Sequence, residues 1–258
     1  MKMDIKNFEY YIETESFHLK FACGAPAVKD KEFHDYHEFV LFMGGKAQFL
    51  SKNIQQELTH GALLVIPKEQ FHQFVVSEPE SYTRCILAFR ENERTNDVIG
   101  SVMNEMRIYI EPDARIVALF SALTELVSSD ASEKEKALFI EGALYQLLIT
   151  LRYFGEGAVT KNVTVSAVVR DAIDFIDKNY TGELSVPMIA AKLFVSESTL
   201  SHKFSHEMNL SIYQYILKKR LISARMRIEA GESYSAAAVN SGFSDYSSFY
   251  RAYKKSYK

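Results

Sequence analysis

The segment from 239 to 255, VNSGFSDYSSFYRAYKK, interleaves cationic and aromatic side chains. Arg251, Lys254 and Lys255 stand among aromatic residues, and Phe249 and Tyr253 lie four apart, on one face of a helix. Guanidinium and ammonium groups donate hydrogen bonds to anionic oxygens, and the planar guanidinium does so through two parallel donors. This pattern predicts a helix that packs through its aromatic face and binds an anionic partner through the other.

The charge of the chain is divided unequally along its length. Residues 161–258 carry 14 Lys and Arg against 9 Asp and Glu, a net +5, whereas residues 1–160 carry 16 against 24, a net −8. Such asymmetry indicates a polyanion as the partner of the basic part. A solvated surface would explain the same charge. The arrangement of the secondary-structure elements that carry the cations must therefore distinguish a polyanion-binding surface from a solvated one.

Those elements are helices, which the sequence predicts for almost all of residues 165–258. Ser185 and Ser196 can cap two short helices that are joined by the turn LFVS, and Pro187 falls in the first turn, where its missing N–H is harmless. Leu200 and Phe204 can hold the second helix down. These are the proportions of a helix-turn-helix.

A long helix, from about Ser211 to Ala230, leads to a second pair of short helices. Gly242 supplies a turn that tolerates positive φ, and Asp245 can cap the last helix. At ~1.5 Å per residue the long helix spans roughly 30 Å, close to the ~34 Å between successive major-groove faces on one side of DNA. The spacing predicts two recognition helices in adjacent major grooves.

The residues expected to contact DNA lie on the outward faces of these two recognition helices. They are Ser198, Thr199, Ser201 and His202 in the first helix, and Tyr246, Ser247, Tyr250, Arg251 and Lys254 in the second. Because only the second set contains permanent cations, we expect it to contribute more of the binding energy.

The acidic part of the chain is predicted to contain strands followed by two amphipathic helices. Residues 7–90 hold short β-rich segments at regular spacing, which predict a barrel or sandwich. Residues 113–154 predict two amphipathic helices with apolar stripes that include Leu144 and Leu147. The stripes either cover the barrel or pair with a second copy. Additional aromatic surface near the end of the second helix favours a homodimer.

The predicted organisation is α+β, in two domains. Its parts are a β-barrel at 1–112, a helical dimerisation segment at 113–154, a Gly-containing linker at 155–164, and an all-α double helix-turn-helix domain at 165–258. No apolar run is long enough to span a bilayer, and the first residues lack the apolar core of a signal peptide. The two cysteines match no metal-binding spacing, so a reduced cytoplasmic setting without membrane contact is expected.

The basic part resembles the DNA-binding domain of AraC/XylS-type transcriptional regulators. The matching segments are LSVPMIAAKLFVSESTLSHKF, SIYQYILKKRLISAR and SGFSDYSSFYRAYKKSY. Three residues depart from the family pattern. Phe194 replaces a turn glycine, which predicts a strained or altered turn; His202 replaces a common arginine; and Ala237 replaces a larger aliphatic residue, which predicts loose packing of the second motif. The family pattern also continues beyond Lys258.

The acidic part resembles the cupin-like sensor barrel of such regulators, through HDYHEFVLFMGG at 34–45 and GALLVIPKEQFH at 61–72. The resemblance implies that His34, Glu38 and His72 converge inside the barrel. Arg84 is either a further effector contact or a surface residue on an exposed strand face. Two imidazoles and a carboxylate can hold a divalent metal, but Glu32 stands where metallo-cupins have another histidine. Sensor barrels of the family mostly bind organic effectors, so no metal or cofactor is expected. His37 should face away from this set.

The combined prediction is a ligand-responsive, sequence-specific transcriptional regulator and not an enzyme. Its expected partners are promoter DNA, a small effector for which a sugar is the family-level expectation, and a second copy of the chain; RNA polymerase is a further candidate. The alternative is a metal-dependent cupin enzyme with a DNA-binding tail, which would require three or four ligands and an open coordination position.

Overall fold

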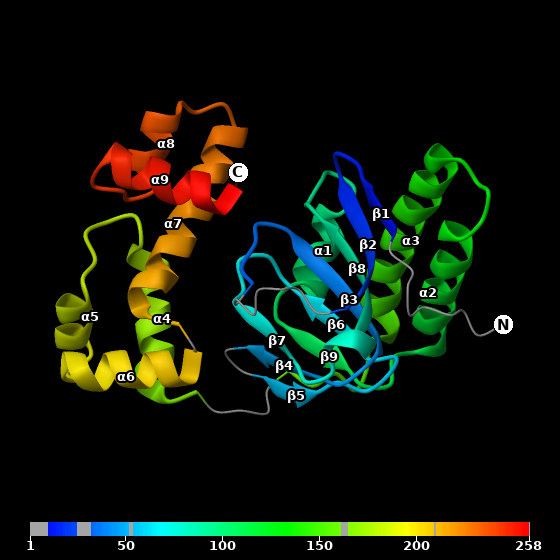
Figure 1. Cartoon of the computed structure of the whole chain (residues 1–258), viewed down its shortest axis with the longest axis horizontal. Helices are drawn as coiled ribbons and strands as arrows, with labels where there is room; N and C mark the ends of the chain where they lie inside the picture. The colour runs from blue at the N-terminus through cyan, green and yellow to red at the C-terminus, as the bar shows by residue number, and fades with distance from the viewer. Residues whose placement is uncertain (1–9, 25–31, 52–53, 161–164, 209, 258) are drawn as a thin grey trace. The chain divides into compact units, whose positions relative to one another are not determined.

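The computed structural model describes residues 10–24, 32–51, 54–160, 165–208 and 210–257 (Figure 1). The chain divides into two compact units, Met1–Val163 and Thr164–Lys258. Within the described residues, the first contains the strands, three α-helices and a short 3-10 helix at Pro79–Ser81, and the second contains only helices.

The strands of the first unit pair into two antiparallel sheets. The larger has the order β1-β2-β8-β3-β6-β9 and the smaller the order β5-β4-β7. The strands are β1 Tyr10–Glu13, β2 Phe17–Cys23, β3 His37–Gly44, β4 Ala47–Ser51, β5 Gln55–Glu57, β6 Leu63–Ile66, β7 His72–Val76, β8 Thr83–Phe89 and β9 Arg107–Tyr109. The expected α+β, two-domain fold is confirmed, but the described strands form two sheets and do not close into a barrel.

Alternation along β3 divides the first unit into two cores. Phe39 belongs to the core between the larger sheet and the helices, whereas Val40 and Phe42 belong to the core shared by the two sheets. Successive side chains of a strand point to opposite faces. The position of a polar residue on β3 therefore decides whether it faces the helices or the interior between the sheets.

Three helices complete the unit: α1 Asn96–Val102, α2 Ala114–Val127 and α3 Glu133–Phe154. In Figure 1, α2 and α3 lie side by side against the larger sheet. Ser132 caps α3: its Oγ accepts a bond from the Glu135 N–H at 3.4 Å, and Glu135 accepts one from the Ser132 N–H at 2.8 Å.

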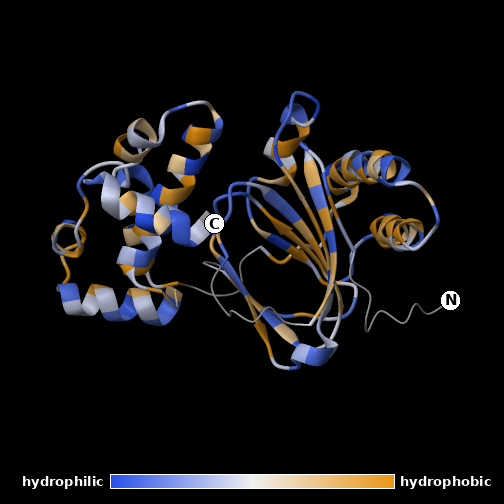
Figure 2. Cartoon of the chain, turned by 45° about the horizontal axis from the view of Figure 1, so that its top comes forward, coloured by the Kyte–Doolittle hydropathy of each residue, from blue (hydrophilic) through white to orange (hydrophobic). Residues whose placement is uncertain are grey.

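The inner stripe of α3 is core. Leu144 and Leu147 are buried against the sheet, so the prediction that this stripe forms a dimer interface is wrong. The outward face instead exposes apolar side chains that include Leu138, Ile149 and Tyr153. Figure 2 shows the mixture of hydrophobic and hydrophilic residues on this helix pair. By length and composition α3 is the one described helix that could cross a membrane, but a buried inner stripe is equally typical of a core helix in a soluble protein.

The start of the predicted linker is attached to the first unit. Val159 and Ile108 of β9 exchange backbone hydrogen bonds of 2.8 and 3.0 Å. The remainder of the predicted linker, 161–164, lies outside the described residues.

The second unit is a chain of six helices within the described residues. They are α4 Ala167–Asn179, α5 Val186–Lys192, α6 Glu197–Met208, α7 Ile212–Glu229, α8 Tyr234–Asn240 and α9 Tyr246–Tyr257. Arg220 of α7 donates to the backbone oxygens of Tyr180 and Gly182, each at 2.7 Å. These bonds hold the turn between α4 and α5 against the long helix.

The caps predicted from the sequence form. Ser185 Oγ accepts the Met188 N–H at 3.3 Å, Ser196 Oγ accepts that of Thr199 at 3.1 Å, and Asp245 Oδ1 accepts that of Ser248 at 2.7 Å. A side-chain oxygen at each position satisfies an N–H group that has no partner within the helix.

Candidate functional sites

The first candidate site lies in the interior between the two sheets. Glu38 is on β3, on the same face as Val40; His72 begins β7 in the opposite sheet; and His34 lies in the loop before β3. All three are buried, with 8% of His34, 4% of Glu38 and none of His72 exposed. The structure thus brings together the three residues that the resemblance placed in one site.

Their ligand atoms converge. Glu38 Oε2 lies 3.1 Å from His34 Nε2 and 3.7 Å from His72 Nε2. One nitrogen or oxygen from each of the three residues falls within 4.8 Å of the others. Glu32 contributes a carboxylate oxygen 3.7 Å from His72 Nε2, and its own side chain is half exposed.

Both imidazoles are oriented through their other nitrogen. His34 Nδ1 lies 2.8 Å from the Tyr36 carbonyl oxygen, and His72 Nδ1 lies 3.1 Å from that of Gln70. Because a carbonyl oxygen only accepts, both Nδ1 atoms carry the proton. The Tyr36 ring stacks on that of His34 with centroids 4.1 Å apart, which holds the imidazole in place.

Charge and burial act in opposite directions at this cluster. Burial lowers the pKa of His34, but the Glu38 carboxylate and the Tyr36 carbonyl outweigh it and raise that pKa above its ordinary value. Burial raises the pKa of Glu38, but the two imidazoles outweigh it and leave that pKa below its ordinary value. The pair therefore favours an ionised carboxylate inside the unit. Two imidazole nitrogens beside such a carboxylate form a donor set that fits a divalent metal ion.

Arg84 shares the interior face but not the cluster. It pairs across β8 and β3 with Phe42, whereas Glu38 pairs with Ala88, so Arg84 lies toward the other end of the same face. Its guanidinium donates to the Gly24 carbonyl at 3.0 Å and lies 4.6 Å from the Tyr82 ring centroid.

Two residues of this interior were missed from the sequence. His18 on β2 pairs with Ala88, which itself pairs with Glu38, so His18 lies on the same face. Burial lowers the pKa of His18, although Glu38 acts against that shift. The Tyr82 hydroxyl is buried, and the described residues provide it with no hydrogen-bond partner. The strand pairing reveals His18, and the packing of the core between the two sheets reveals Tyr82.

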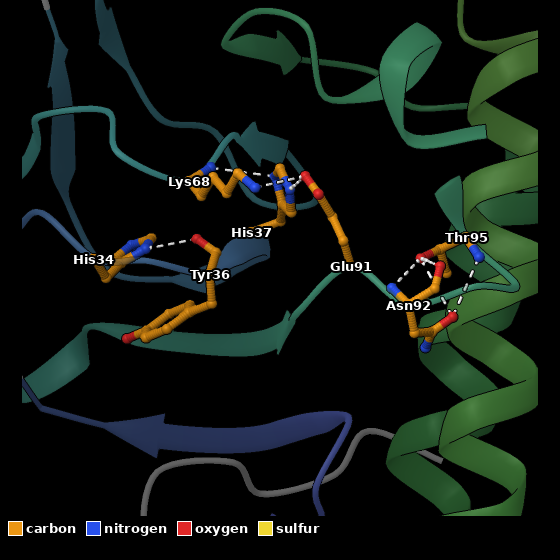
Figure 3. A network of polar contacts seen from close by, with 7 residues as sticks. All are labelled: His34, Tyr36, His37, Lys68, Glu91, Asn92 and Thr95. Carbon is orange, nitrogen blue, oxygen red and sulfur yellow. Dashed lines mark hydrogen bonds and ion pairs between the residues drawn. The ribbon is translucent and has the colours of Figure 1, made fainter. Parts of the chain in front are cut away.

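His37 faces the opposite side of β3, as predicted. Its Nδ1 accepts the Lys68 backbone N–H at 3.1 Å, and its Nε2 lies 3.0 Å from Glu91, whose carboxylate also pairs with Lys68 Nζ at 2.9 Å (Figure 3). Burial lowers the pKa of His37, although Glu91 acts against that shift. This histidine is a structural link with both ring nitrogens partnered.

The second candidate site is formed by the outward faces of α6 and α9. The structure exposes Ser198, Thr199, His202, Tyr246, Ser247, Tyr250, Arg251 and Lys254, and leaves Ser201 half-buried. The opposite faces hold the helices to the unit, through Leu200 and Phe204 of α6 and Phe249 and Tyr253 of α9. Each recognition helix is therefore anchored by apolar side chains and presents polar ones.

The long helix between the two recognition helices matches the predicted spacer. α7 contains 18 residues, which corresponds to about 27 Å at ~1.5 Å per residue. Ser211 and Gln214 form a capping box at its start, and Gly231 follows its end with a φ of 95°. A helix of this length is somewhat shorter than the ~34 Å spacing of major grooves along one side of DNA.

Comparison with known proteins gives matches to both units. A family model described as an AraC-like ligand binding domain matches residues 18–148, and one described as a helix-turn-helix domain matches residues 189–258. The Msm operon regulatory protein of Streptococcus mutans serotype c is 26% identical over 263 residues, covering 98% of this chain and 91% of that protein. The probable transcriptional regulator LumQ of Photobacterium leiognathi is 28% identical over 151 residues, covering 58% of this chain and 59% of that protein.

Among solved structures, ToxT from Vibrio cholerae is 13% identical, with 93% of this chain and 94% of that chain covered and a TM-score of 0.40. The ligand-binding model alone spans just over half of the chain. This chain therefore belongs to the AraC family of transcriptional regulators, with an N-terminal ligand-binding domain and a C-terminal helix-turn-helix DNA-binding domain.

Proposed function

We propose that this regulator binds promoter DNA through α6 and α9 and changes that binding when a small polar effector occupies the interior between the two sheets. The observation that carries the proposal is the pair of capped helices whose outward faces are polar and exposed. Arg251 and Lys254 supply the cations that a phosphate backbone or a guanine edge would bind.

The effector would contact His34, Glu38, His72 and Arg84, which share one interior face of the first unit. Carboxylate, imidazole and guanidinium groups suit a ligand rich in hydroxyl oxygens, and a sugar of an operon for carbohydrate use is the class we expect. Such a ligand alters DNA binding only if it binds one conformation of the chain more tightly than another.

A second copy of the chain is the proposed partner of α3. Its outward face exposes Leu138, Ile149 and Tyr153, and Gly142 between them leaves open space where a Cβ would stand. Exposed apolar residues at this spacing along one helix suit a symmetric pairing with the same face of a partner.

The test is selection of a duplex from random DNA by the full chain, followed by titration of that duplex at several salt concentrations. We expect affinity to fall steeply and linearly on logarithmic axes as salt rises, because bound cations displace counterions from phosphates. Failure to enrich any sequence, or a response that is flat in salt, would rule out the proposed DNA-binding role.

A further inference from the structure

When both imidazoles are neutral, three hydrogen-bond acceptors meet inside the first unit, and none of the three residues places a donor between them. Since Nδ1 of His34 and of His72 each donates to a backbone carbonyl, the neutral form of each ring presents a lone pair on Nε2. Both lone pairs are directed at the ionised Glu38 carboxylate, whose Oε2 lies 3.1 and 3.7 Å away. Converging acceptors repel one another unless a hydrogen-bond donor or a positive charge lies among them.

Within this cluster, the Nε2 atom of His72 lacks a hydrogen-bond partner among the described residues. His72 is also wholly buried. A single proton shared between His34 and Glu38 would satisfy that pair, but it would leave His72 at 3.7 Å from the carboxylate, beyond hydrogen-bond range. A buried ring nitrogen without a partner is costly, so a group that satisfies it is expected.

His37 serves as an internal comparison. It is one residue from Glu38 and just as buried, yet its Nδ1 accepts from Lys68 and its Nε2 faces Glu91. A histidine with a structural role in this sheet thus has both nitrogens partnered. His34 and His72 have the arrangement found in metal-binding histidines, in which one nitrogen donates to a carbonyl and the other is left for the ion.

We propose that His34 Nε2, His72 Nε2 and a Glu38 oxygen bind a divalent first-row transition metal ion. Ligands at about 2.1 Å from one ion lie roughly 3.0–3.5 Å from one another in octahedral or tetrahedral geometry. The separations of 3.1 and 3.7 Å from Glu38 to the two imidazoles differ from this range by at most a few tenths of an ångström, and the ligand atoms of all three residues lie within 4.8 Å of one another. Two imidazoles and one carboxylate suit zinc, iron, cobalt or manganese.

Glu32 is placed to serve as an outer ligand. Its carboxylate lies 3.7 Å from His72 Nε2, and its side chain is half exposed, so it stands between the buried set and the surface. The backbone of Glu32 is paired with that of His72 through bonds of 2.8 and 3.2 Å, which fixes the approach of this carboxylate. The three buried ligands leave coordination positions that Glu32, or an oxygen of an effector, can occupy. This inference stands independently of the proposed DNA-binding role.

The experiment is metal binding by the full chain after treatment with chelator. Cobalt(II) is titrated in and followed by its visible absorption, which reports nitrogen and oxygen ligation, and zinc(II) is titrated by calorimetry. We expect one ion per chain, and a melting temperature that rises with free metal. His72→Ala and Glu38→Gln should each weaken binding about a hundred-fold or more, since loss of a partner that only orients a ligand already costs about 10–100-fold.

His60→Ala is the matched control, because it removes an exposed imidazole of the same unit and should leave metal affinity unchanged. Glu38→Gln keeps the size of the side chain, and circular dichroism of each variant shows whether it folds. The absence of binding by the unaltered chain overturns the proposal, as does binding that survives in folded His72→Ala and Glu38→Gln. A polar effector that binds without metal would then be the group that satisfies His72. DNA binding by the metal-free chain, measured separately, tests the proposed function.

Discussion

At the residue scale, Phe194 is the strained position of the first helix-turn-helix. Its φ is 56°, in the left-handed region, and its side chain is 96% exposed. That conformation costs a residue with a Cβ about 1–2 kcal/mol, and the exposed ring regains none of it by packing. The strain that the sequence predicted at this position is confirmed.

Phe194→Gly should therefore stabilise the second unit by about 1 kcal/mol, after the larger chain entropy of glycine is subtracted. Amide hydrogen exchange of α5 and α6 in the full chain measures the change. Tyr213→Gly is the control, because it places glycine at an exposed aromatic position inside α7 and should destabilise the unit by up to about 1 kcal/mol. Equal effects of the two variants would contradict this account of the turn.

Arg251 of α9 and His202 of α6 test how much each recognition helix contributes to the free energy of DNA binding. Both are exposed, but only Arg251 is a permanent cation with two parallel donors. Arg251→Ala should weaken binding to a selected duplex at least about ten-fold, which is about 1.4 kcal/mol, and His202→Ala should weaken it less. Titration of both variants with one duplex at one salt concentration compares them. A larger loss of affinity in His202→Ala than in Arg251→Ala would show that α6, and not α9, contributes more to DNA binding.

At the scale of elements, Gly242 allows the turn of the second helix-turn-helix to pack against the segment between α4 and α5. Its φ is 90°, and a Cβ there would lie 2.7 and 2.8 Å from the backbone oxygens of Tyr180 and Thr181. The turn between α8 and α9 therefore packs directly on the turn between α4 and α5, at a separation that only glycine allows.

Gly242→Ala should destabilise the second unit by roughly 3 kcal/mol or more, because it adds a backbone clash to an unfavourable φ. Gly231→Ala isolates the conformational part, since Gly231 has a φ of 95° and nothing within 4 Å of the added Cβ. We expect it to cost about 1 kcal/mol. Hydrogen exchange of the full-length variants gives both values, and similar losses would show that the close approach is unimportant.

At the scale of the whole molecule, the proposed dimer and the core of the first unit use opposite faces of α3. Leu138→Glu combined with Ile149→Glu should give a folded monomer, because these residues are 72% and 45% exposed and neither belongs to the buried core of the unit. Sedimentation velocity of the variant and the unaltered chain measures the association state.

Leu144→Ala is the contrasting variant. It should lower the free energy of unfolding of the first unit by about 2–5 kcal/mol, because it leaves a cavity in the core, and it should not change association of the folded chain. A Leu138→Glu, Ile149→Glu chain that remains a dimer would exclude this face.

Local chemistry was readable from the sequence alone. Ser185, Ser196 and Asp245 mark the helix starts where the structure has them, because a cap bonds to a group only two or three residues away. The short strands and the two helix-turn-helix motifs follow from period and turn residues for the same reason. The resemblance to AraC/XylS-type regulators rests on the same local segments, which need no contact between distant parts of the chain.

Tertiary structure alone decided which face of each element packs in the core and which face is left for a site or an interface. The stripe with Leu144 and Leu147 was ambiguous between core and interface, since an apolar stripe has the same period in both settings. The lone pairs of His34 and His72 depend on bonds to carbonyls of two separate loops, and their convergence on Glu38 depends on the packing of one sheet on the other. Such relations join segments far apart in the chain, and no local pattern encodes them.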